Sequence, residues 1–396
     1  MCIRDRFYHQ KVITQNHDKN TRHTRNVFRI PIESIFDPQV TEINRLPMSV
    51  PLSSFASLAE ARKGGVSENR IMLDGLWDFI LLESFNSLSS DMVSENSKAN
   101  EWDSIQVPGA WTRQNQIDKP HYTNIVMPWS GLEPPNIPTL NPTGVYRKVL
   151  NVSLDSKEKK YVLHVGSAES MVLVFCNGTF LGFGKDSRLP SEFDITNFLK
   201  DGENTLCLVI PKWSDGTWIE DQDHWFHGGV HRSVWIEKRN VFGIEDVHLT
   251  CDFDPEEQIG MLKGVVLLSG ARKGWTSKLR LETLSGVTLA ESEDTKVPFP
   301  NSSSPLNELL DAYSFLGRRT SFEFTNLTIK PWTSETPNLY NVFIELADEK
   351  GKCQEVVSQR VGFRRIEVKE RELRVNGKAI IIHGVNRHDH HHVTGK

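Results

Sequence analysis

Short runs of β-branched and aromatic residues recur through the first half of the chain, and no helical block separates them. Tyr161–Val165 and Met171–Phe175 are two such runs, each bounded by turn residues. Asn177-Gly178 follows the second run, and this dipeptide is a strong signal for a tight β-hairpin. Many short strands at regular spacing indicate a β-sandwich or jelly roll. We therefore predict a mainly β chain, with a jelly-roll domain over residues 41–240.

A second β-rich segment covers residues 241–362. Its candidate strands are Gly264–Leu268, Lys278–Leu281 and Val342–Leu346. A segment of about 120 residues with this pattern fits an immunoglobulin-like sandwich. Residues 1–40, in contrast, mix charges without a helical stripe and are predicted to form a disordered or arm-like N-terminal segment.

The pattern changes again near the C-terminus. Glu372–Val375 and Ala379–Ile382 flank Asn376-Gly377, which predicts another hairpin. The second arm is apolar at every position, as expected for a strand buried on both faces of a parallel sheet. The polar cluster of residues 386–389 follows it, as at the end of a (β/α)8 barrel strand, where active sites lie. We predict that residues 363–396 begin such a barrel and are incomplete, because a full barrel takes about 250 residues.

Charge and composition exclude several partner classes. The chain carries 46 Lys and Arg against 51 Asp and Glu, a formal net charge of −5. It has no broad basic field, so we expect no nucleic-acid partner. No apolar stretch approaches the length that spans a bilayer, so we expect no membrane partner. The five cysteines are scattered, and the N-terminus has no signal-peptide pattern. We therefore expect reduced thiols and a cytoplasmic protein.

A series of short motifs then points to one family by its order and spacing. The motifs are Asn44–Pro47, Leu76-Trp77, Val107–Trp111, Tyr122–Asn124, Asn141–Tyr146, Asp186–Asp194, Trp213–Gly216, Glu220–Asp223, Pro337–Tyr340, Val361–Arg364, Asn376–Lys378 and Asn386–His391. No single motif is specific, but together they make residues 44–396 resemble the N-terminal part of a β-galactosidase of glycoside hydrolase family 2.

The resemblance implies a sugar-binding jelly roll, an immunoglobulin-like sandwich and a catalytic (β/α)8 barrel, in that order. It also implies a retaining enzyme that hydrolyses terminal non-reducing β-D-galactosides such as lactose and is a homo-oligomer when full length. Retaining hydrolysis requires two carboxylates that face the glycosidic bond. The family supplies both as Glu on later barrel strands, which this sequence does not reach. We expect the 396-residue chain to be inactive alone, and Asp389 is not expected to substitute for either Glu.

The resemblance assigns three residues to the sugar site. His388 would hydrogen-bond a sugar hydroxyl and stabilise the transition state. Asp223 would accept from a sugar hydroxyl and bind Na⁺ through its carboxylate oxygens, whereas the Mg²⁺ ligands of the family lie later in the barrel. Asn124 would contact the substrate with an amide that both donates and accepts. Without the family motif, the same residues read as a solvated histidine, a surface acidic loop and a turn asparagine.

The remaining polar motifs receive structural interpretations. The histidines from His388 to His392 lack a recognised zinc spacing and a cysteine partner, so metal ligation is their weaker interpretation. Asp186–Asp194 is predicted to be structural, with Arg188 paired to Glu192 and an aspartate capping a turn at each end. Trp218 and Trp225 flank the acidic loop, where packing is favoured over sugar contact.

Two other functions remain open. One is a non-catalytic carbohydrate-binding module made of the two sandwiches; the other is a different family 2 specificity, β-glucuronidase or β-mannosidase. The polar cluster after the last apolar run argues against the first, because a binding module has no need to begin a barrel strand. The His-rich ending favours galactose over glucuronate within the resemblance.

Overall fold

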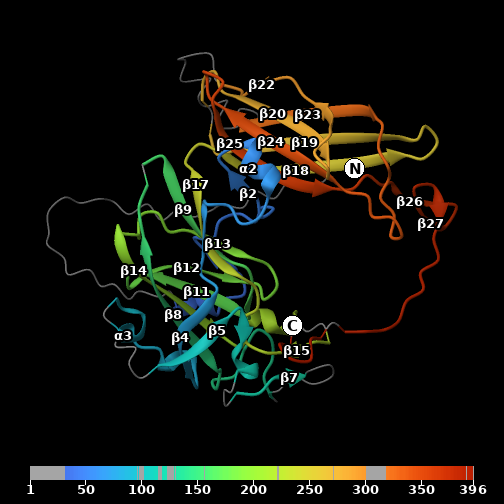
Figure 1. Cartoon of the computed structure of the whole chain (residues 1–396). Helices are drawn as coiled ribbons and strands as arrows, with labels where there is room; N and C mark the ends of the chain where they lie inside the picture. The colour runs from blue at the N-terminus through green and yellow to red at the C-terminus, as the bar shows by residue number, and fades with distance from the viewer. Residues whose placement is uncertain are drawn as a thin grey trace.

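The computed structural model describes residues 32–95, 97, 102–114, 118–122, 129, 131–155, 157–220, 223–270, 272–299, 318–388 and 390–395 of the chain. Within them the chain forms two antiparallel β-sandwiches, a small C-terminal sheet and an extended segment that returns to the first sandwich (Figure 1). The mainly β class predicted from the sequence is confirmed. No helix in the described part of the chain has both the length and the apolar character needed to cross a membrane.

The first sandwich pairs a seven-stranded sheet with a four-stranded sheet. The larger sheet contains, in order, β1 (Glu42–Ile43), β12 (Thr179–Lys185), β11 (Met171–Cys176), β14 (Gly202–Pro211), β8 (Thr143–Val152), β4 (Gly75–Leu82) and β5 (Asp103–Val107). The smaller sheet contains β13 (Ser191–Asp194), β9 (Lys159–Val165), β17 (Val234–Asn240) and β3 (Arg70–Met72). Two minor sheets complete it: β10 (Ala168–Glu169), β16 (Gly229–Val230) and β6 (Gly109–Ala110) in one, and β15 (Trp225–Phe226) with β7 (His121–Tyr122) in the other.

The hairpin predicted at Asn177-Gly178 is present between β11 and β12. Both turn residues have positive φ, 49° and 74°, which is the backbone conformation that a tight two-residue hairpin requires. At the centre of the sheet, β8 and β14 pair without a break from Thr143↔Pro211 to Val152↔Gly202.

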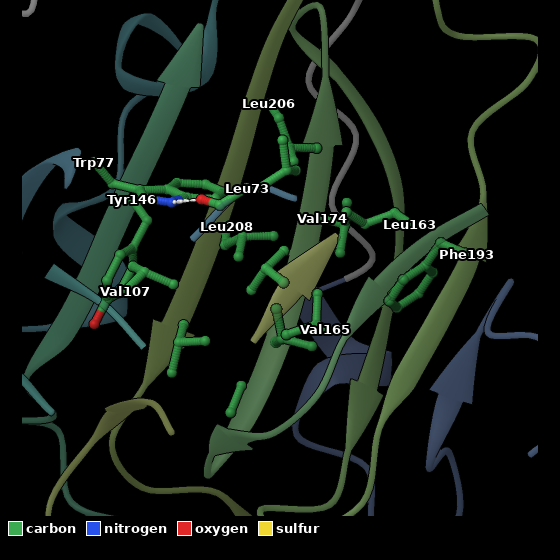
Figure 2. Packing of buried hydrophobic residues seen from close by; sticks show 14 of the residues in the cluster. Leu73, Trp77, Val107, Tyr146, Leu163, Val165, Val174, Phe193, Leu206 and Leu208 are labelled. Atoms are coloured by element: carbon green, nitrogen blue, oxygen red, sulfur yellow. Dashed lines mark hydrogen bonds between the residues drawn. The ribbon is translucent and has the colours of Figure 1, made fainter. Parts of the chain in front are cut away.

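The larger sheet is buried on both faces, which explains why β11 is apolar at every position. Val172 and Val174 face the core between the two sheets, whereas Leu173 and Phe175 face a second core on the outer side. The outer core is closed by three short helices, α1 (Ile32–Ile35), η1 (Phe85–Ser87) and α3 (Ser90–Val93). Figure 2 shows the inner core, where the Trp77 indole N–H donates to the Leu73 carbonyl at 2.8 Å.

The helix α1 changes the interpretation of the N-terminal arm. Ile35 is fully buried in the outer core, and Phe36 and Val40 pack beside it. The last part of the segment predicted as a loose arm is therefore attached to the sandwich, because it covers apolar side chains of the larger sheet. Residues 1–31 lie outside the described residues.

The second sandwich also has two antiparallel sheets. One contains β18 (Ile244–Asp254), β19 (Ile259–Leu268) and β23 (Arg319–Leu327). The other contains β2 (Ser53–Phe55), β25 (Cys353–Val361), β24 (Tyr340–Ala347), β20 (Thr276–Thr283) and β21 (Thr288–Glu291), with β22 (Thr295–Lys296) also paired to β20. Its core includes the fully buried Leu262, Val266, Leu279 and Val342.

One segment lies in a different sandwich from the one its sequence position suggests. The range 41–240 was predicted to be a single jelly roll, but β2 pairs with β25 as an edge strand of the second sandwich. The helix α2 (Leu58–Lys63) follows β2 and lies against the same sheet (Figure 1). Phe55 and Ala61 form one buried cluster with Phe343 and Val356. This segment covers an apolar sheet face that would otherwise be exposed.

The C-terminal hairpin is confirmed, although its second strand is shorter than predicted. β26 (Ile366–Lys369), β27 (Glu372–Val375) and β28 (Lys378–Ala379) form a three-stranded sheet. Ile381 and Ile382 lie beyond β28 and are 81% and 77% exposed. Burial on both faces is the expectation for this run within a complete barrel; in this chain the run is exposed, because no strand among the described residues pairs beyond Ala379.

Candidate functional site

A pair of short strands, β7 and β15, forms the base of the candidate site. Trp225 lies opposite Tyr122 in this pair, and Phe226 lies opposite His121. The Tyr122 and Trp225 rings are 5.4 Å apart and tilted by 35°, and both remain about half exposed, at 47% and 40%. The pair therefore presents an aromatic wall to solvent beside the loop that carries Asp223.

Asp223 precedes β15 and has a left-handed backbone, with φ of 60°. This conformation is uncommon for a residue with a side chain, although Asp tolerates it better than most. The Tyr122 hydroxyl donates a hydrogen bond to Asp223 Oδ1. The carboxylate is thus fixed on one side by a residue of the neighbouring strand.

The C-terminal segment supplies the other side of the site. It leaves the hairpin beside the second sandwich and runs back to the first, ending near β15 (Figure 1). His388 Nε2 lies 2.7 Å from Asp223 Oδ2. The His388 side chain is 53% exposed and that of Asp223 is 36% exposed, so this is a surface contact of modest energy when considered alone.

A cavity of about 250 Å³ lies between the β7–β15 pair with its loop and the C-terminal segment. It is lined by Tyr122, Asp223, His224, Trp225, His388, His390 and Gly395. Among the described residues of this lining, Asp223 is the only carboxylate. The cavity thus combines one acceptor, several imidazoles and an aromatic wall, a mixture suited to a small polar ligand with an apolar face.

Further contacts hold the segment against the sandwich. The Arg113 guanidinium donates to the carbonyls of His392 and Val393, both at 3.0 Å. Gly395 packs on the His227 ring, and a Cβ atom at this glycine would lie 2.6 Å from that ring. His227 is itself held by Thr112, whose hydroxyl lies 2.9 Å from Nδ1.

A buried polar network lies beneath β7. The Lys212 side chain is fully buried, and its Nζ lies 2.8 and 3.0 Å from the two carboxylate oxygens of Asp118. The same ammonium donates to the Lys119 carbonyl at 2.6 Å and lies 3.0 Å from His121 Nδ1. Burial lowers the pKa of Lys212, while Asp118 acts in the opposite direction. Burial and the nearby Lys212 charge also lower the pKa of His121. The network anchors the segment that ends in Tyr122.

Of the three predicted site residues, the structure brings Asp223 and His388 into direct contact. Asn124 lies outside the described residues, so its position is not given. Tyr122 and Arg113 were not predicted as site residues. Tyr122 belongs to the same motif as Asn124, which was the available signal; nothing local marks Arg113, because its partners are backbone carbonyls far along the chain.

The two tryptophans beside the acidic loop behave differently. Trp218 packs against Trp129 with ring centroids 5.5 Å apart and donates its indole N–H to the Asn136 carbonyl, as the packing interpretation predicts. Trp225 instead lines the cavity.

In the motif Asp186–Asp194, the predicted turn caps are present. Asp186 Oδ1 accepts from the backbone N–H of Arg188 and of Leu189, and Asp194 Oδ1 accepts from that of Thr196. The predicted Arg188–Glu192 pair is wrong. Glu192 lies on β13 opposite His164, and it pairs with that histidine and with Arg239. Arg188 lies instead 3.7 Å from Glu169.

The donor set of the cavity offers little to a metal ion. Within the described residues there is no group of three or more His, Cys, Asp or Glu side chains that could hold one. The oxygens of Asp223 suit Na⁺ chemically, but they already accept from Tyr122 and contact His388. A sodium site here would therefore need ligands beyond Asp223.

Comparisons with known proteins agree with this architecture. Residues 71–240 match the family model of the glycosyl hydrolases family 2 sugar binding domain. Residues 243–364 match the model described as glycosyl hydrolases family 2, and residues 366–396 match that of the family 2 TIM barrel domain.

Similar curated proteins include a β-galactosidase of Vibrio vulnificus, 36% identical over 360 residues, and one of Photobacterium profundum, 34% identical over 362 residues. Both alignments cover 91% of this chain but only 34% of the relative, so the chain spans about a third of the length of these proteins.

Similar solved structures are β-glucuronidases of Bifidobacterium dentium and Bacteroides uniformis. Their TM-scores are 0.60 and 0.61, each at 19% identity. The alignments cover 80% and 82% of this chain and 52% and 36% of those chains, and they show a shared fold.

The two sandwiches and the three colinear matches define the accessory β-domains of the glycosyl hydrolases family 2, followed by the start of a match to its TIM barrel domain. The chain belongs to glycoside hydrolase family 2.

Proposed function

We propose that this chain is the N-terminal part of a retaining β-galactosidase that hydrolyses terminal β-D-galactosides. The observation that carries the proposal is the contact between Asp223 of the first sandwich and His388 of the C-terminal segment at a shared cavity. Asp223 would accept from a sugar hydroxyl and provide one oxygen ligand to Na⁺, while His388 would donate to the sugar. Galactose is favoured because the curated relatives named above are β-galactosidases at 34–36% identity.

The chemistry of bond cleavage would lie elsewhere in the full-length protein. A retaining mechanism needs an acid/base and a nucleophile, both carboxylic, about 5 Å apart. Asp223 is the one carboxylate among the described residues that line the cavity, and its oxygens are engaged by Tyr122 and His388. We therefore expect binding contributions from this chain and no hydrolysis by it alone. Any Mg²⁺ requirement would likewise depend on residues outside this chain.

The test is a hydrolysis assay with 4-nitrophenyl β-galactoside and β-glucuronide, on the full-length protein that contains this chain and on the 396-residue chain. The expected result is turnover of the galactoside by the full-length protein, with at least tenfold lower kcat/KM for the glucuronide, and no turnover by the chain. A preference for the glucuronide would overturn the galactose assignment. Turnover of neither substrate, with sugar binding retained, would favour a carbohydrate-binding module.

A further inference from the structure

The Asp223 carboxylate needs an external support to keep one orientation. Its side chain is 36% exposed, and its backbone has positive φ in the loop two residues before the short strand β15. A carboxylate in such a position can rotate freely unless hydrogen bonds hold it, and each rotation would move the acceptor that a sugar hydroxyl must meet.

Tyr122 provides this support from the opposite strand. Its hydroxyl donates to Asp223 Oδ1, while Oδ2 faces His388 at 2.7 Å. The two oxygens are therefore distinguished: one is held by the sandwich, and the other points to the C-terminal segment. The Tyr122 ring is fixed in turn by the tilted contact with Trp225.

The backbone that carries Tyr122 is anchored in the protein interior. His121 pairs with Phe226 across the β7–β15 ladder and contacts the fully buried Lys212. Lys212 is bound to Asp118, which also accepts from the Trp111 indole N–H at 2.8 Å. A fully buried ammonium with these partners fixes its neighbours, because breaking one contact would leave an unpaired buried charge. The buried contacts of Lys212 and His121 therefore restrict the backbone next to Tyr122, and with it the position of the Tyr122 hydroxyl.

We propose that Tyr122 is a positioning residue, which orients the Asp223 carboxylate toward the sugar hydroxyl and toward His388. The role of the sugar in this inference rests on the proposed function, whereas the orientation of Asp223 by Tyr122 does not. Tyr122 need not touch the reacting bond, since it acts through Asp223.

The test is Tyr122→Phe, which removes the hydroxyl and keeps the ring that contacts Trp225. In the full-length enzyme, KM for 4-nitrophenyl β-galactoside should rise about tenfold and kcat should change less than threefold, because a contact that binds substrate and transition state alike is weakened. Tyr161→Phe is the matched control: its hydroxyl contacts Asp155 and Ser153 in the same sandwich and should leave KM unchanged.

A structural readout separates this inference from the proposed function. In crystals of the 396-residue chain, Tyr122→Phe should leave the backbone of β7 and β15 in place while the Asp223 carboxylate turns away from its present position. An unchanged carboxylate, still 2.7 Å from His388, would overturn the positioning role, as would an unchanged KM. If the wild-type enzyme does not cleave galactosides, the proposed function fails, and the crystal comparison alone decides the role of Tyr122.

Discussion

At the scale of single residues, the buried charges of the first sandwich are held in specific pairs. Glu192 lies between His164 at 2.9 Å and Arg239 at 2.6 Å. Burial alone would raise the pKa of Glu192, but these two partners together lower it to about 2. The folded state therefore favours the ionised carboxylate more strongly than the unfolded chain does.

This shift has a defined effect on stability. Since the folded pKa is depressed from 4.5 to about 2, the stabilisation is present above pH 4.5 and is lost as the pH falls toward 2. The shift corresponds to about 3 kcal/mol. Glu192→Gln should lower stability at pH 7 by a similar amount and flatten the acid side of the stability profile. Urea unfolding between pH 2 and 7 measures both effects.

The exposed Glu203 on β14 supplies the control for this measurement, because Glu203→Gln changes the same charge at the surface. If the free energy of unfolding falls equally steeply with decreasing pH in the wild type and in Glu192→Gln, the depressed pKa of Glu192 is contradicted.

At the scale of elements, the second sandwich is completed by a segment from near the N-terminus. β2 forms its edge strand, and α2 covers the face of β24 and β25 that the main core does not reach. The helix is capped at its N-terminus by Ser57, whose hydroxyl accepts from the Glu60 N–H. An ion pair between Arg62 and Glu282, 2.5 Å apart, connects it to β20. The covering segment thus has its own local helix-start signal and a long-range ion pair.

Phe55→Ala tests the contribution of this segment. Phe55 is 5% exposed and packs on Phe343 and Val356. Loss of its ring should leave a cavity and destabilise the sandwich by about 3 kcal/mol. Hydrogen exchange should become faster in β24 and β25 while the strands of the first sandwich keep their protection.

Leu76→Ala serves as the comparison, because Leu76 is 64% exposed. Unchanged exchange in β24 and β25 would show that α2 and β2 are not needed for the stability of that sheet.

At the scale of the whole molecule, the residues that lead into the C-terminal hairpin are attached to the second sandwich. Phe363 is fully buried in its core, and Arg365 forms ion pairs with Asp252 and Asp254. The apolar run directly after Ala379 is exposed, at 41% for Ile380, 81% for Ile381 and 77% for Ile382. The predicted boundary at residue 362 therefore cuts into a packed core, and a cut after Ala379 does not.

Shortening the chain after Ala379 should raise the monodisperse fraction in light scattering, because it removes the exposed run Ile380–Ile382 and keeps the hairpin. A chain that ends at Gly362 should unfold at a lower temperature, since it lacks Phe363. Equal stability of the two shortened chains, or no gain in monodispersity after the cut at Ala379, would contradict this account.

Much of the fold could be predicted because its signals are local. The turn at Asn177-Gly178 and the unbroken apolar run of β11 indicate strand positions within a few residues, and the Asp186 cap acts over three residues. The partners of Glu192 and the place of β2 could not be predicted in this way. They depend on which strands become neighbours, and strand alternation alone does not determine those neighbours.

The same division applies to the candidate site. The sequence by itself determined two β-rich modules, a C-terminal hairpin and, through ordered motifs, the residues Asp223 and His388 as site candidates. Only the tertiary structure decided that these two side chains meet, that Tyr122 holds the first, and that Arg113 holds the segment bearing the second. The physical reason is that hairpins and caps arise from neighbouring residues, whereas these contacts join segments far apart in the chain and form only once both sandwiches are packed.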